Sequence, residues 1–80
     1  MYTVYVLQDK FEKFYKGMTN NIKRRFPEHK KGKTKTTKKM EELKIVYTEE
    51  YETFEEARKR ELYFKTSAGR RFLKKKLEKK

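Results

Sequence analysis

The sequence predicts an α+β fold in which a small three-stranded antiparallel sheet is flanked by helices, in the order β-β-α-β-α-α. Two observations predict it. Short runs of β-branched and aromatic residues fit strands, and longer segments with apolar residues three or four apart fit amphipathic helices. The chain has 80 residues without an internal repeat or linker, so we expect a single domain over residues 1–80 with a thin core.

Three segments carry the strand pattern. Residues 2–7 are almost wholly β-branched, aromatic or aliphatic, and their two apolar faces favour a central strand. Residues 14–18 form a second strand, joined to the first as a hairpin by the polar segment 8–13. Residues 43–48 form the third strand, after a loop rich in lysine and threonine over residues 33–40.

The first helix lies between the second and third strands. Thr19 or Asn20 is expected to cap it, and it runs to about residue 31, where Gly32 stops it. Pro27 lies inside this helix and is expected to remove one hydrogen bond and to kink it.

Two further helices follow the third strand. Thr53 and Glu56 match a capping box for a helix that runs to about residue 66. Ser67 is expected to cap a last, basic helix. Its inward side chains are Phe72, Leu73 and Leu77, and its mostly outward side chains are Arg70, Arg71, Lys74, Lys75 and Lys76.

The balance of charge favours an anionic partner. The chain has 24 Lys+Arg against 12 Asp+Glu, a formal net charge of +12 and a pI near 9.9, and phosphate backbones are the commonest partner for such an excess. There is no cysteine and one histidine, which excludes disulfides and zinc sites of the usual kinds. No apolar run reaches membrane-spanning length and no secretory signal is evident, so the expected location is the cytoplasm.

The cations are unevenly distributed along the chain. Nine lie between residues 23 and 39 and more crowd the last eleven residues, whereas seven glutamates lie between residues 41 and 56. This pattern favours one face for nucleic acid and another turned away from it. The alternative is a lysine-rich, solvated surface such as heat-adapted proteins carry. The cations expected to touch phosphates are Lys33, Lys35, Arg70, Arg71, Lys74 and Lys75.

Two side chains of the first helix interrupt its apolar stripe. Ile22 and Phe26 open the stripe, and Arg25 and His29 lie on or beside it. Burying an unpaired charge is costly, so these groups must pair with each other, with a metal or with a ligand.

A carboxylate interrupts the next helix in the same way. Glu61 lies in the middle of an apolar stripe. The stripe consists of Phe54, Ala57 and Phe64. A structural ion pair with a nearby arginine, Arg25 or Arg60, is the alternative to a metal site.

An ordered set of short motifs spans the chain and resembles the GIY-YIG nuclease family in its small, single-domain form. The set is Thr3-Val4-Tyr5, Tyr15-Lys16-Gly17, Arg25, His29 and Glu61. The order of elements also agrees with the fold of that family. Thr3 replaces the first glycine of the family signature and Lys16 replaces its isoleucine.

The resemblance implies a metal-dependent endonuclease that hydrolyses DNA phosphodiester bonds, with Mg²⁺ or Mn²⁺ as cofactor and DNA repair as a typical role. It maps the metal-binding glutamate to Glu61 and the helical arginine to Arg25. It maps the family's two tyrosines to Tyr5 and Tyr15, and the family's His/Tyr position to His29. Which tyrosine is the general base is left open. RNA is the alternative substrate, and a partner protein would supply target recognition.

The chemistry of phosphodiester hydrolysis agrees with these residue types. The reaction needs a deprotonated water and neutralised charge on the phosphorus. Mg²⁺ commonly keeps several waters, so one carboxylate can hold it. A guanidinium offers a rigid donor fork that lysine cannot copy. A tyrosine serves as the base if nearby cations lower its pKa from about 10, and His29 can orient or relay the proton.

Each of these residues also has a plain structural explanation. Tyr5 and Tyr15 suit a half-buried sheet, and His29 can interact with a helix dipole. Gly17 can serve the strand-to-helix turn or let nucleic acid approach the backbone. For the whole chain, the alternatives are a non-catalytic basic nucleic-acid-binding module that acts with a partner protein, and a small RNA-associated protein.

Overall fold

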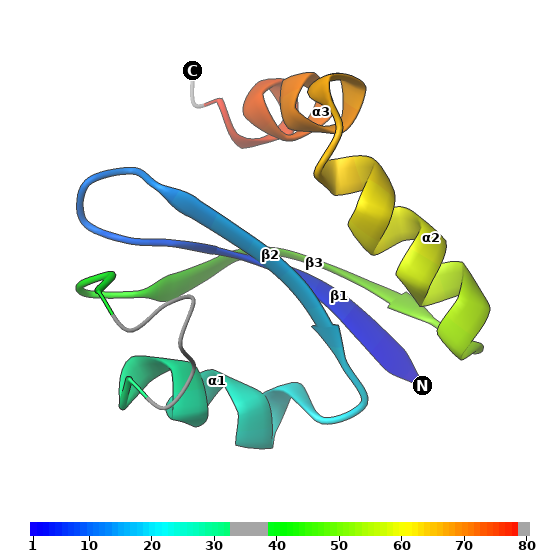
Figure 1. The fold of residues 1–80 in the computed structure, drawn as a ribbon, viewed down its shortest axis with the longest axis horizontal. Helices are drawn as coiled ribbons and strands as arrows, with labels where there is room; N and C mark the ends of the chain where they lie inside the picture. The colour runs from blue at the N-terminus through cyan, green and yellow to red at the C-terminus, as the bar shows by residue number, and fades with distance from the viewer. Residues whose placement is uncertain (33–38, 79–80) are drawn as a thin grey trace.

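The computed structural model describes residues 1–32 and 39–78, and the expected strands and helices occur in the expected order (Figure 1). The α+β prediction is confirmed. The elements are β1 (Tyr2–Gln8), β2 (Phe14–Thr19), α1 (Ile22–Lys30), β3 (Lys44–Tyr51), α2 (Phe54–Phe64) and α3 (Ser67–Leu77).

The sheet has the strand order β2-β1-β3 and is antiparallel on both sides of β1. The first strand is therefore central, as its two apolar faces predicted. Tyr5 of β1 lies opposite Gly17 of β2 and Thr48 of β3. The third strand extends to Tyr51, three residues further than the sequence predicted.

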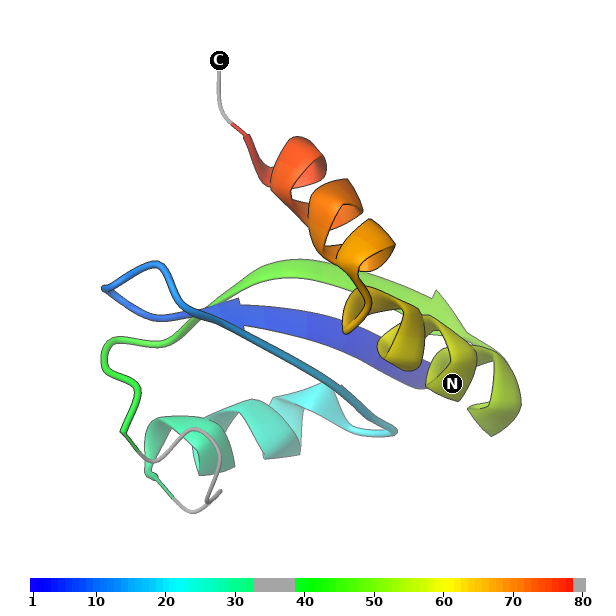
Figure 2. The ribbon, with the colours of Figure 1, turned by 45° about the horizontal axis from the view of Figure 1, so that its top comes forward.

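Helix α1 lies on one face of the sheet, and α2 and α3 lie on the other (Figures 1 and 2). Because successive side chains of a strand point to opposite faces, β1 contributes to two cores. The core on the α2 and α3 side contains Val4, Val6, Ala57, Phe64 and Leu73. The core on the α1 side contains Tyr5, Leu7 and Leu43, with Ile22 and Phe26 packed against it.

The start of α1 differs from the prediction. Asn21 is the N-cap, and its side chain accepts a hydrogen bond of 3.1 Å from the backbone N–H of Arg24. Thr19, one of the two predicted caps, instead accepts a hydrogen bond from the N–H of Asn21. The helix continues through Pro27 to Lys30, so the kink at the proline stays a prediction.

The last two helices meet at a sharp corner. Thr53 caps α2 as predicted, but Thr66 rather than Ser67 caps α3, with its Oγ1 accepting a hydrogen bond from the N–H of Gly69. A Cβ at Gly69 would collide with the carbonyl oxygen of Tyr63. A glycine is therefore required where the two helices approach each other.

An ion pair anchors α2 to the sheet. The Arg60 guanidinium donates two hydrogen bonds, of 2.8 and 3.1 Å, to the carboxylate of Glu49 on β3. The same guanidinium lies 4.7 Å from the ring centroid of Phe64 and 4.8 Å from that of Phe72, so charge and cation–π contacts act together. No helix within the described residues is long and apolar enough to cross a membrane.

Candidate active site

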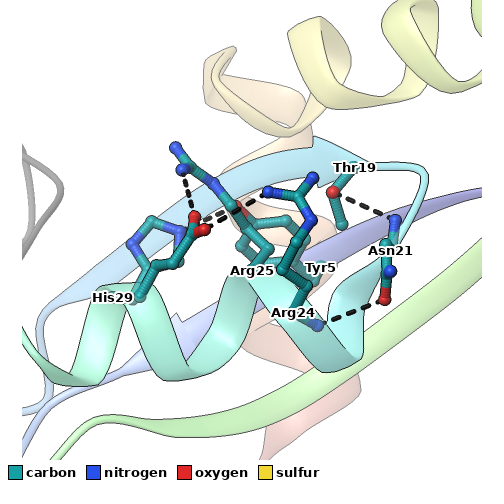
Figure 3. A network of polar contacts seen from close by, with 7 residues as sticks. Tyr5, Thr19, Asn21, Arg24, Arg25 and His29 are labelled. Carbon is teal, nitrogen blue, oxygen red and sulfur yellow. Dashed lines mark hydrogen bonds and ion pairs between the residues drawn. The ribbon is translucent and has the colours of Figure 1, made fainter.

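The central pair of the site is Tyr5 of β1 and His29 of α1. The side chain of Tyr5 points from the sheet toward α1, and the Tyr5 hydroxyl lies 2.8 Å from Nε2 of His29 (Figure 3). Each residue is only 1% exposed. The sequence prediction that His29 turns inward is confirmed, because a buried imidazole and a buried phenol satisfy each other here.

Gly17 leaves room for the Tyr5 ring. The two residues are opposite each other in the β1–β2 ladder. A Cβ at position 17 would lie 2.7 Å from the Tyr5 hydroxyl oxygen, closer than a carbon can pack there. The glycine therefore leaves space for the end of the Tyr5 phenol against β2. A direct contact between Gly17 and nucleic acid stays a prediction.

Tyr15 completes a cluster of three rings. Its ring centroid lies 6.2 Å from that of Tyr5 and 5.0 Å from that of His29. Its side chain is half-buried, so this tyrosine is more accessible to a ligand than Tyr5.

Arg25 lies one helical turn before His29, at the edge of this cluster. Its guanidinium pairs with Glu28 at 2.9 Å, and the neighbouring Arg24 pairs with the other oxygen of Glu28 at 3.2 Å (Figure 3). Arg25 is half-buried and also contacts the Tyr5 hydroxyl, whereas Arg24 is exposed. Only one of the two arginines is therefore in the site.

The electrostatics of Tyr5 differ from the sequence expectation. A tyrosine base requires nearby cations to lower the phenol pKa from about 10, but the pKa of Tyr5 is raised to about 12. Burial is the largest cause and the neighbouring Tyr15 adds to it, and together they outweigh the opposing effect of Arg25. An ionised Tyr5 is therefore scarce near neutral pH.

His29 shows the opposite shift. Burial, and then the positive charge of Arg25, lower the pKa of His29 below its ordinary value of 6.5. The imidazole is therefore neutral at neutral pH, and one of its nitrogens can accept a proton.

This shift makes stability depend on pH. Below the ordinary pKa the unfolded chain protonates His29 more readily than the folded chain, so stability is lost as the pH falls below about 6.5. We expect the urea midpoint of the wild type to fall more steeply with acid than that of His29→Gln, which cannot titrate. Parallel curves for the two proteins between neutral and acidic pH would contradict the assignment.

Glu61 enters from α2 and is 7% exposed. Its Oε1 pairs with Nη1 of Arg58 and its Oε2 pairs with Nζ of Lys65, each at 3.0 Å. The predicted burial is confirmed, but the two arginines named in the structural alternative are not the partners of Glu61. Arg25 pairs with Glu28, and Arg60 is held by Glu49. The true partners follow from helix geometry, since they lie three residues before and four residues after Glu61.

The predicted stripe around Glu61 needs one correction. Ala57 and Phe64 are buried with Glu61, whereas Phe54 is 50% exposed. Phe54 is the first residue of α2 and contacts the edge of the Tyr2 ring, with centroids 5.8 Å apart.

Glu61 lies close enough to the ring cluster for its charge to raise the pKa of Tyr5. Within the described residues no three or more His, Cys, Asp or Glu side chains come together as a metal cluster, so a closed protein cage does not fit here. A single buried carboxylate with half-exposed cationic partners does fit Mg²⁺, which takes most of its ligands from water and phosphate. Glu61 would hold such an ion.

The cations that were predicted to touch phosphates, here called the cationic footprint, lie only partly within the described residues. Lys33 and Lys35 lie outside the described residues. The other four predicted members, Arg70, Arg71, Lys74 and Lys75, are exposed on α3. Sequence reasoning missed Lys65 as the partner of Glu61, and it treated Lys16 only as a departure from a signature. Strand alternation gives the signal, since Lys16 between Tyr15 and Gly17 must face the opposite side of the sheet.

Comparison with known proteins gives the family. The model of the GIY-YIG catalytic domain matches residues 1–76. The chain belongs to the GIY-YIG family. The resemblance carried by Tyr5, Tyr15, Gly17, Arg25 and Glu61 is thereby confirmed at the level of the family, which is a family of nucleases that act on nucleic acids and generally use divalent metals.

Relatives of this GIY-YIG domain are also small proteins. It is 42% identical over 72 residues to a UPF0213 protein of Limosilactobacillus reuteri (strain DSM 20016), covering 86% of this chain and 75% of the relative. It is 41% identical over 63 residues to the UPF0213 protein CPE1444 of Clostridium perfringens (strain 13 / Type A), covering 78% and 68%. The solution NMR structure of the UPF0213 protein BH0048 from Bacillus halodurans matches with a TM-score of 0.57 and 30% identity, over 91% of this chain and 82% of that one.

Proposed function

We propose that this protein is a Mg²⁺-dependent endonuclease that hydrolyses DNA phosphodiester bonds. One observation carries the proposal. A phenol, an imidazole, a guanidinium and a carboxylate, from Tyr5, His29, Arg25 and Glu61, come from three different elements to one place at the sheet. A role in DNA repair and a cytoplasmic location stay predictions.

Tyr5 and His29 can together activate water. The high pKa of Tyr5 means that it cannot act as a free phenolate near neutral pH. It can take a proton from the attacking water as its own proton passes to Nε2 of the neutral His29, 2.8 Å away. The proton thus ends on the imidazole, and no separate tyrosinate forms. This step requires the tautomer with hydrogen on Nδ1 of His29.

Arg25 can neutralise the charge that builds up on the phosphate oxygens. Its side chain is 34% exposed beside Tyr5, and the side chain of its present partner Glu28 is 29% exposed. An ion pair of this kind contributes little to stability, so the guanidinium can move from Glu28 to a phosphate at small cost.

Glu61 would hold Mg²⁺, and the ion bound there would supply Lewis acidity to the phosphodiester. Arg58 and Lys65 must first release the carboxylate. Both side chains are about half-exposed, at 52% and 50%, so water can replace their contacts with Glu61.

The test is cleavage of labelled DNA by the purified protein. We expect nicking of duplex or branched DNA in Mg²⁺ and none in EDTA. A panel that includes RNA of the same sequence tests the choice of DNA. Equal cleavage in EDTA, or no cleavage of any substrate in Mg²⁺, would contradict the proposal.

The alternative function is a basic nucleic-acid-binding module without turnover, acting with a partner protein. One observation favours it, namely that both oxygens of Glu61 already have cationic partners within the chain. Tight DNA binding without cleavage in any divalent metal would establish this alternative.

The two tyrosines can be separated by removing only their hydroxyls. Tyr5→Phe and Tyr15→Phe keep the rings that pack against His29, so both variants should fold. We expect Tyr5→Phe to lose most of its turnover, because the proton path to His29 is removed. Tyr15→Phe is the matched control on the neighbouring strand, and its effect shows whether Tyr15 shares the role. Normal cleavage by both variants, with unchanged thermal melting, would rule out a catalytic hydroxyl.

A further inference from the structure

A groove of about 410 Å³ lies on the other face of the sheet from Tyr5, between α3 and the β1–β2 hairpin. Its apolar surface comes from one ring and two leucines, and its cations come from β2 and α3. These residues are Phe14, Leu73, Leu77, Lys16, Arg70 and Lys74. The proposed catalytic step uses none of them.

One end of the groove carries cations that no carboxylate of the described residues neutralises. Lys16 is half-buried, and among the described residues no carboxylate pairs with it. Burial, and then the charges of Arg70 and Lys65, lower the pKa of Lys16. Like charges gathered in a partly apolar place are stabilised by an anion.

This end of the groove is connected to Glu61. The guanidinium of Arg70 donates a hydrogen bond of 3.1 Å to the carbonyl oxygen of Lys65. The ammonium of Lys65 in turn lies 3.0 Å from Oε2 of Glu61. A strand whose scissile phosphate lies beside Arg25 and Glu61 would therefore meet Lys65 and then Arg70 on its way into the groove.

The middle of the groove offers an aromatic surface. Phe14 is 38% exposed, and Nζ of Lys16 lies 6.0 Å from its ring centroid. Proteins that bind single strands combine exposed rings, on which nucleobases stack, with nearby cations that neutralise the phosphates.

The far end of the groove is acidic and gives it a direction. Glu12, beside the hairpin turn, and Glu78, after the end of α3, both line it. These carboxylates repel phosphates, so an anion is favoured at the end formed by Lys16 and Arg70.

We propose that this groove binds the nucleotide next to the scissile phosphate, with its base stacked on Phe14 and its phosphate held by Lys16 and Arg70. The inference deepens the proposed function and rests on it for the identity of the ligand as a nucleic-acid strand. Lys65 links the two sites. If Glu61 binds a metal, the ammonium of Lys65 is freed and can contact the phosphate held by Lys16 and Arg70.

The test measures binding in EDTA, so that cleavage plays no part. The probes are a fluorescent oligothymidylate of about twelve nucleotides and an abasic strand of the same length, a size suited to one small binding groove. We expect the wild type to bind the oligothymidylate more tightly. Phe14→Ala should weaken it roughly 5- to 100-fold, down to the affinity of the abasic strand, whose own affinity changes little.

Phe11→Ala is the matched control, since Phe11 is an exposed ring on the same hairpin and does not line the groove. It should leave both affinities unchanged. If Phe14→Ala weakens both probes equally, or weakens neither, the stacking role is wrong. Because the ratio of the two affinities is the readout, general damage to the fold cannot imitate the expected result.

The phosphate contact is tested by salt. Lys16→Gln and Arg70→Gln should each weaken both probes and reduce the slope of log K against log salt by roughly 0.7. Lys13→Gln removes an exposed lysine of the hairpin that does not line the groove, and it should leave the slope unchanged. Equal slopes for Lys16→Gln and the wild type would contradict the site. If binding changes as expected but no substrate is cleaved, the nuclease proposal is refuted and the proposal that the groove binds a nucleotide is supported.

Discussion

Replacing Glu61 by Gln is expected to lower the single-turnover rate in saturating Mg²⁺ at least a hundredfold, roughly the effect of losing a metal ligand. The amide keeps the size of the side chain but loses the charge that would hold the ion. Binding of DNA in EDTA should not weaken, because the substitution removes a negative charge and frees the cations of Arg58 and Lys65. The measurement is cleavage of a labelled strand at saturating protein, beside an anisotropy titration.

Glu55→Gln is the matched control for this substitution. Glu55 is an exposed carboxylate in the first turn of the same helix, and its loss should leave the rate unchanged. A Glu61→Gln protein that cleaves like the wild type would remove Glu61 from the mechanism. A variant that unfolds would instead support the structural role of the ion pairs with Arg58 and Lys65.

Arg25→Ala is expected to depress the single-turnover rate by about 100- to 1,000-fold while weakening DNA binding only slightly. The reason is that Arg25 meets the phosphate most strongly when charge accumulates in the transition state. The rate must be measured at saturating protein, so that any loss of affinity is removed from the comparison.

The neighbouring residue provides an unusually close control. Arg24 also pairs with Glu28, at 3.2 Å, but its side chain is exposed. Arg24→Ala therefore removes the same charge and a similar ion pair, and it should leave the rate almost unchanged. If both variants cleave at similar rates, Arg25 belongs to the footprint rather than to the catalytic site.

The sheet could be predicted almost completely from the sequence, because residue type and burial agree along it. The two apolar faces of residues 2–7 required a central strand, and β1 is central. The helix starts were less predictable. Thr19, Asn20 and Asn21 are all good capping residues, and Thr66 and Ser67 compete in the same way, so local preference alone does not decide between them.

The buried polar residues of the site could also be predicted, since His29 and Glu61 interrupt apolar stripes and both are buried. Their partners could not. Helix spacing offers Arg58 and Lys65 to Glu61, but which nearby cations remain available depends on contacts elsewhere, and Glu49 of the distant strand β3 holds Arg60. The pKa of Tyr5 was unpredictable for a similar reason, because it depends on the balance between burial and Arg25.

The central claim is that Glu61 supports metal-dependent chemistry, and a Mg²⁺ titration of the single-turnover rate tests it most directly. The account predicts no cleavage by the wild type in EDTA and a rate that rises with Mg²⁺ to a plateau. It predicts that Glu61→Gln stays near zero over the same range or needs far more metal. Identical titration curves for the two proteins, or a wild-type rate that does not depend on metal, would contradict it.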